Sequence, residues 1–160
     1  EKGGYEHASA DLFRGASMIL VPTAATEVGD LVELGALFRK VGFHRIKFCT
    51  PQLHDRMIAY TSQLPHVISN SYVKSPAARD LEGFAGGSCR DMSRTACLTE
   101  AMWTELFLLN REQLLPEIDQ LLSSVAELRE ALAAGDAAEL EGLLRRGRED
   151  RERMEARPGA

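Results

Sequence analysis

The chain has 160 residues and a mass of 17.6 kDa, enough for one domain of ordinary size or a small domain with an appendage. Its 19 Lys and Arg residues against 24 Asp and Glu residues give a net charge of −5, which argues against nonspecific nucleic-acid binding, because such binding needs clustered cations. No apolar run approaches the roughly 18–20 residues that cross a membrane, no signal peptide is visible, and three cysteines without a Cys-x-x-Cys pair suggest a reduced, cytoplasmic protein.

A strand, a helix and a second strand are predicted in the first 50 residues. Residues 17–21 (Ser-Met-Ile-Leu-Val) are apolar and stopped by a proline, which predicts a buried strand. Residues 26–41 carry apolar side chains at helical spacing, with Thr26 as a plausible N-cap and Gly42 as a plausible stop. Residues 44–49 alternate and predict a second strand, so a parallel α/β crossover is expected. Two strands do not make a stable parallel sheet, so we expect the sheet to continue in a missing part of the chain or in a partner.

The rest of the chain is predicted to be helical. Pro51 suits a first helical position, and a helix is expected to run from it to about Val73. Pro65 lies inside this helix and should kink it or remove a backbone hydrogen bond. Residues 74–87 contain several glycines and predict a connection with at most a short helix, after which residues 88–96 form a further helix.

A long helix is predicted from Thr99 to Leu132. Its apolar residues lie three and four apart, a pattern typical of a helix bundle or a coiled-coil-like dimer. Pro116 should bend it and Gly135 should end it. Asp136 then begins a capping-box pattern for a last helix, whose charged end is either a solvated helix or a frayed tail.

Three groups of residues in the helical part are candidates for chemistry, although each also has a purely structural interpretation. Gln63 and His66 lie three apart on one helix face, but a lone histidine there is more often a hydrogen-bonded core residue. Asp91 could hold Arg94 by a salt bridge and aim its guanidinium at an anion, whereas exposed ion pairs of this kind usually contribute little. Trp103 is the single tryptophan, and most such residues belong to a core or an interface.

Other common site motifs are missing from the sequence. The chain contains no Gly-x-Gly-x-x-Gly, no P-loop and no His and Cys spacing suited to zinc, so no metal is expected. The glycine-rich stretch at residues 83–87 has no strand before it, which favours a flexible connector over a phosphate cradle.

Taken together, the motifs resemble those of the prephenate dehydrogenase family. Residues 61–66 (Thr-Ser-Gln-Leu-Pro-His), after a His-Asp pair at 54–55, are similar to that family's His-Asp followed by Ser-His-Leu-Pro-His. Residues 85–96 resemble its Gly-Gly-Gly-Phe-Arg/Lys-Asp-x-Thr-Arg-Ile-Ala, and residues 102–110 resemble its next motif, Met-Trp followed by Asn. The resemblance covers almost the whole chain to about residue 132, and the order of three motifs makes it specific.

The resemblance implies a mainly α-helical chain with two parts. Residues 1–50 would be the incomplete C-terminal edge of an α/β dinucleotide-binding domain, and residues 51–157 would be an all-helical domain for dimerisation and substrate binding. The implied reaction is the NAD-dependent (or NADP-dependent) oxidative decarboxylation of prephenate to 4-hydroxyphenylpyruvate, on the way to tyrosine. The implied partner is a second copy of the chain, joined through the C-terminal helices.

The resemblance also assigns roles to individual residues. Arg94 matches the family's substrate-binding arginine, and Asp91 would orient it. His66 matches a histidine that lines the substrate pocket, whereas Gln63 stands where many members have histidine and could still form hydrogen bonds. Trp103 matches a tryptophan that reaches the site from the partner subunit; on one unbroken helix it would face away from Arg94, because nine residues turn about 900°.

Two further expectations concern the start of the chain. Glu1 matches an acidic residue that gates the pocket, and the family's catalytic histidine lies in a motif before it. We therefore expect an inactive fragment of a longer enzyme, without the catalytic residue or the main cofactor site. The alternatives are an arogenate dehydrogenase of the same family and a purely structural helical dimerisation module.

Overall fold

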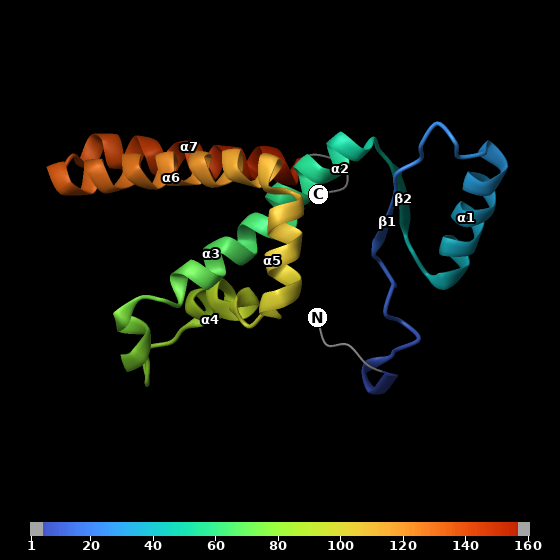
Figure 1. Cartoon of the computed structure of the whole chain (residues 1–160). Helices are drawn as coiled ribbons and strands as arrows, with labels where there is room; N and C mark the ends of the chain where they lie inside the picture. The colour runs from blue at the N-terminus through green and yellow to red at the C-terminus, as the bar shows by residue number, and fades with distance from the viewer. Residues whose placement is uncertain (1–4, 157–160) are drawn as a thin grey trace. The chain divides into compact units, whose positions relative to one another are not determined.

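The computed structural model describes residues 5–156, which form two compact units divided between Ile58 and Ala59 (Figure 1). The first unit contains a small parallel sheet, and the second contains the long helices. A mainly helical fold with a strand–helix–strand segment at its start is therefore confirmed. The domain boundary after residue 50 remains a prediction.

The first unit has the predicted strand, helix and strand. After a 3₁₀ turn, η1 (Tyr5–His7), the elements are β1 (Ser17–Leu20), α1 (Val28–Val41), β2 (Arg45–Phe48) and α2 (Pro51–Ile58). The strands β1 and β2 pair in parallel, as predicted for an α/β crossover.

One predicted helix cap is wrong and one helix stop is confirmed. Thr26 does not cap α1; its Oγ1 instead accepts a hydrogen bond of 2.9 Å from the backbone N–H of Thr23. The N-cap position belongs to Glu27, without a side-chain bond to the helix. Gly42 ends α1 in the left-handed region, at φ 112°, a conformation that glycine adopts without steric cost.

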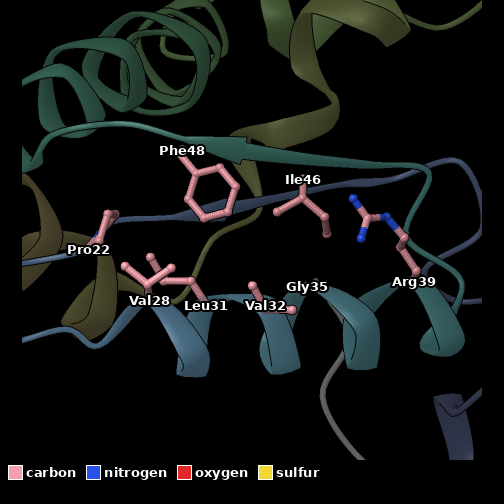
Figure 2. A pocket seen from close by; sticks show the side chains of 8 residues that line it. All are labelled: Pro22, Val28, Leu31, Val32, Gly35, Arg39, Ile46 and Phe48. Atoms are coloured by element: carbon pink, nitrogen blue, oxygen red, sulfur yellow. The ribbon is translucent and has the colours of Figure 1, made fainter.

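The prediction that the first strand is buried is wrong for the described residues. Ile19 on β1 is 41% exposed and Phe48 on β2 is 49% exposed, because two strands cannot cover each other's faces. A cavity of about 550 Å³ lies between α1 and the sheet (Figure 2). Its lining is apolar except for one guanidinium and consists of Pro22, Val28, Leu31, Val32, Gly35, Arg39, Ile46 and Phe48. The exposed apolar side chains of this unit suit a further part of a protein packed against them.

In the second unit, a single turn of π-helix precedes Pro65. This turn, η2 (Ala59–Gln63), is followed by α3 (Leu64–Tyr72). The single helix predicted from residue 51 to 73 is therefore divided into three segments, α2, η2 and α3. A proline cannot donate a backbone hydrogen bond and its ring crowds the preceding turn, and a wider turn relieves that crowding. The predicted irregularity at Pro65 is therefore confirmed.

The predicted helix from Thr99 to Leu132 is interrupted. The remaining elements are η3 (Pro76–Asp80), α4 (Gly87–Ser93), η4 (Arg94–Ala96), α5 (Glu100–Leu109), α6 (Arg111–Ala134) and α7 (Ala137–Glu155). The break lies at Asn110, with φ −109° and ψ 19°, and not at Pro116, which lies inside α6. The regular apolar spacing continues across the break, so periodicity alone could not show it.

The helices α6 and α7 form a hairpin with the predicted turn (Figure 1). Gly135 ends α6 at φ 65°, and Asp136 Oδ1 accepts a hydrogen bond of 3.0 Å from the N–H of Glu139. The Glu139 carboxylate does not bond the N–H of Asp136, which donates to the backbone oxygen of Ala131 at 3.0 Å; it pairs with Arg146 at 3.3 Å instead. Only half of the predicted capping box therefore forms.

A small core joins η2, α3, α5 and α6. Ala59, Leu64 and Leu114 are buried at its centre. Partly buried side chains from the same elements surround them, namely Val67, Ile68, Phe107, Ile118 and Leu121. This cluster fixes the start of α3 and the end of α5 near the start of α6. No helix between residues 5 and 156 is long and apolar enough to cross a membrane.

Candidate functional site

The structure brings His66 and Trp103 together. Their rings stack with centroids 3.7 Å apart and planes inclined by 28°, and Phe107 lies one turn further along α5, 5.4 Å from Trp103. Both residues belong to the same chain, so this contact needs no partner subunit. Arg94 and Trp103 do not lie on one helix, because the helical segment η4 ends before α5 begins. The expectation that the two residues face opposite sides of one helix therefore does not apply.

The hydrogen bond of His66 defines its neutral tautomer. Nδ1 lies 2.8 Å from the backbone oxygen of Ser62, one turn earlier. A carbonyl oxygen only accepts, so Nδ1 carries the proton. Nε2 is then an acceptor in the neutral ring and a donor in the charged ring, and the structure gives it no partner among residues 5–156.

Gln63 lies in a buried amide network. The side chain is 4% exposed, and its Nε2 donates to the backbone oxygen of Leu106 at 3.1 Å. Its Oε1 accepts from Nδ2 of Asn110 at 2.8 Å. Leu106 lies in the last turn of α5 and Asn110 is the break before α6, so this one amide connects three elements.

A groove of about 330 Å³ opens between α3 and α5. Each helix contributes one face, and the lining residues are Val67, Asn70, Ser71, Lys74, Leu98, Glu100, Trp103, Thr104 and Phe107. Trp103 and Phe107 form an aromatic wall, whereas Lys74 and Glu100 bring opposite charges to the same groove. The arrangement suits a small molecule with a ring and charged substituents.

Arg94 and Asp91 belong to the neighbouring elements. Arg94 begins η4, which packs against α3, the helix that carries His66. Asp91 lies three residues earlier on α4, and both side chains are exposed. The orienting role of Asp91 and the substrate contact of Arg94 remain predictions.

The remaining predicted features do not form a cofactor or metal site in the described part of the chain. Glu1 lies outside the described residues. The glycine-rich residues 83–87 connect η3 to α4 and do not follow a strand, so they do not form a dinucleotide cradle. Between residues 5 and 156 no three His, Cys, Asp or Glu side chains gather as metal ligands.

Sequence reasoning missed a pair formed by Tyr72 and Cys89. A hydrogen bond to Cys89, the negative charge of its thiolate form and desolvation raise the pKa of Tyr72, in that order. Both residues line a cavity of about 280 Å³ between the end of α3, η3 and α4. They lie on different elements, so no local spacing signals their contact.

Sequence reasoning also missed Lys74 and Glu100 in the groove. Residues 67, 70, 71 and 74 share one face of α3 and the following turn, and residues 100, 103, 104 and 107 share one face of α5. The sequence alone shows this spacing, but only the fold shows that the two helix faces meet in one groove.

The comparison with protein families identifies the helical part. The family model for the dimerisation domain of prephenate dehydrogenase matches residues 50–146. A cyclohexadienyl dehydrogenase from Zymomonas mobilis is 29% identical over 142 residues, which cover 85% of this chain and 48% of that protein. The chain thus spans about half the length of this curated relative.

Two solved structures share the fold. The prephenate dehydrogenase of Aquifex aeolicus, in complex with hydroxyphenyl propionate and NAD+, is 28% identical with a TM-score of 0.81, over 96% of this chain and 55% of that one. The arogenate dehydrogenase of Synechocystis is 25% identical with a TM-score of 0.73, over 90% of this chain and 54% of that one.

Proposed function

The chain belongs to the prephenate dehydrogenase family, and we propose that it is the C-terminal, dimerising and substrate-binding part of an enzyme that oxidatively decarboxylates prephenate. The observation that carries this proposal is the stack of His66 on Trp103, a residue that lines the groove between α3 and α5, inside the matched domain. A purely structural module has no need for a histidine whose Nε2 has no hydrogen-bond partner among residues 5–156.

Each site residue has a role suited to a dicarboxylate with a six-membered ring. Trp103 supplies a flat apolar surface for the ring, and His66 Nε2 supplies one hydrogen bond. Arg94 supplies the cation that a carboxylate requires, with Asp91 holding its guanidinium in place. The negative net charge of the chain does not oppose this, because the substrate experiences the local charge.

The oxidation step requires NAD or NADP, which accepts the hydride in such enzymes. The described residues do not fit this cofactor, because no glycine-rich loop follows β1 or β2. We therefore place the main cofactor site and the catalytic histidine in a further part of the enzyme, and we expect no turnover of prephenate by these 160 residues.

The fluorescence of Trp103 tests substrate binding directly, since it is the single tryptophan. Titration of the 160-residue chain with 4-hydroxyphenylpropionate should change this emission and saturate. Arg94→Ala should weaken binding roughly 10- to 100-fold, as expected for a lost charged hydrogen bond. Arg90→Ala, four residues earlier on α4, is the matched control. Absence of any binding would favour the structural dimerisation module instead.

Arogenate is a second candidate substrate. Arogenate carries an amino acid group where prephenate has a keto acid, and Lys74 and Glu100 in one groove suit a carboxylate and an ammonium. Competition of arogenate and prephenate for the Trp103 signal distinguishes the two. If Glu100 binds the ammonium, Glu100→Gln should weaken arogenate binding and leave prephenate binding unchanged.

The proposal includes a homodimer and a cytoplasmic location. The matched domain is a dimerisation domain, which supports self-association through the C-terminal helices. Cys49, Cys89 and Cys97 are all free, and a reducing compartment would keep them so.

A further inference from the structure

We propose that Gln63 is a positioning residue: its amide pins the junction of α5 and α6 to the start of α3 and thereby sets the His66–Trp103 stack. The sequence suggested a direct substrate contact for this residue, but the structure shows its amide bonded to the protein at both ends. The link to substrate binding rests on the proposed function, whereas the link to Trp103 does not.

The network is well suited to hold two helices at one point. Gln63 is buried, and its donor and acceptor are each used once, by Leu106 and by Asn110. Asn110 is also the point where α5 ends and α6 begins, and its backbone oxygen accepts from the N–H of Leu114 at 3.0 Å. The amide therefore holds the end of α5 and the start of α6 together by hydrogen bonds at the point where the two helices meet.

The stack lies one turn away from this network along both helices. His66 follows Gln63 by three residues, and Trp103 precedes Leu106 by three residues. The start of α3 and the end of α5 pack together in the core, and Trp103 and Phe107 line the groove between the two helices. Three residues correspond to about 4.5 Å along a helix, so a small change at the amide contact changes the ring contact directly.

An apolar side chain cannot replace this amide. Gln63→Met keeps the length of the side chain but removes both hydrogen bonds of the amide, the one to Leu106 and the one from Asn110, in a part-buried place, which is costly. Asn110→Ala removes only the second of these bonds and leaves the bond from Gln63 to Leu106 in place. Both variants should therefore perturb Trp103, and Gln63→Met should do so more strongly.

The test measures Trp103 in folded variants of the 160-residue chain. Far-ultraviolet circular dichroism first confirms the helix content of Gln63→Met, Asn110→Ala and the double variant. The near-ultraviolet band of Trp103 should then shrink in all three, and 4-hydroxyphenylpropionate should bind roughly tenfold more weakly. The double variant should be no worse than Gln63→Met, because that change already removes the bond that Asn110→Ala removes. Gln120→Met, on the exposed part of α6, is the matched control and should change neither quantity.

The outcomes separate this proposal from the proposed function. An unchanged Trp103 band in folded Gln63→Met would overturn the positioning role. Weaker ligand binding in Gln63→Met with an unchanged ligand-free Trp103 band would show that Gln63 contacts the ligand, which also overturns it. If the unmodified chain binds no hydroxyphenylpropionate, the proposed function fails, while the ligand-free Trp103 band still decides the positioning role. If Gln63→Met does not fold, Asn110→Ala tests the bond between the two amides, and an unchanged Trp103 band in that variant would then overturn the positioning role.

Discussion

His66 is held by two contacts, and its Nε2 has no partner among residues 5–156. Its Nδ1 is fixed by the Ser62 carbonyl, and its face lies against Trp103. The π turn and Pro65 precede it directly, and such irregular turns often accompany functional residues. The histidine thus has a defined orientation before any ligand binds.

Replacement of His66 by phenylalanine separates its two roles. His66→Phe keeps an aromatic ring against Trp103 but removes Nε2. We expect the near-ultraviolet band of Trp103 to persist and the affinity for 4-hydroxyphenylpropionate to fall roughly tenfold, the usual size for one lost hydrogen bond to a charged group. Calorimetric titration measures the affinity. Equal affinity of the two proteins would show that Nε2 does not face the ligand.

Tyr72 gives a prediction about pH at the same scale. The bond to Cys89 raises the pKa of Tyr72 above its ordinary value of 10.0. Because the folded state retains the phenol proton more strongly, the stabilisation is present below about pH 10 and is lost as the pH rises through the raised pKa. Cys89→Ala should lower the pKa of Tyr72 towards its ordinary value, as measured by NMR of ring-labelled tyrosine. Cys97→Ala is the control, and an equal shift in it would contradict the assignment.

At the scale of elements, the sequence predicts the termini that depend on local chemistry. Gly42, Gly135 and Asp136 have the conformations or bonds that their side chains favour, and the structure confirms all three. Thr26 fails because a competing local bond with Thr23 uses its hydroxyl. The break at Asn110 was not predictable from periodicity, because Gln63 stabilises it from 47 residues away.

The same distinction applies to the candidate site. Gln63, His66, Arg94 and Trp103 were found through their motifs, but the motifs do not say which of them touch. The stack, the amide network and the groove all join α3 to α5, so they depend on tertiary packing. Lys74 and Glu100 belong to no motif and became candidates only through the groove they line.

The α6–α7 turn provides a stability prediction for an element. Asp136→Ala removes the acceptor for the N–H of Glu139 and should lower the free energy of unfolding by about 0.5–2 kcal/mol. Asp136→Asn keeps an acceptor and should cost much less. Urea denaturation followed by circular dichroism measures both. Equal losses in the two variants would show that the carboxylate charge, not the cap, is the cause.

At the scale of the whole molecule, the second unit leaves a large part of its apolar surface uncovered. Met102, Leu106 and Leu109 on α5 are 49%, 39% and 77% exposed. A helix that is apolar on most of its faces is normally buried, and α5 is of this type. On α6 a second row of exposed side chains follows near-heptad spacing, namely Leu115, Leu122, Val125 and Leu132. The matched domain is a dimerisation domain, so we propose that a second copy covers one or both of these surfaces.

The row on α6 allows a direct test of that dimer. Leu122 is 59% exposed, so Leu122→Glu should leave the fold of one chain intact. In a two-fold dimer the change occurs twice, and each copy forfeits the burial of one leucine, about 1.5–3 kcal/mol. The dissociation constant should therefore rise roughly 100-fold or more, which sedimentation equilibrium detects as a shift to monomer. Gln120→Glu adds the same charge about 200° away around the helix and should leave the dimer intact. Dissociation by both variants would point to the added charge, and dissociation by neither would place the interface on α5 and away from this row.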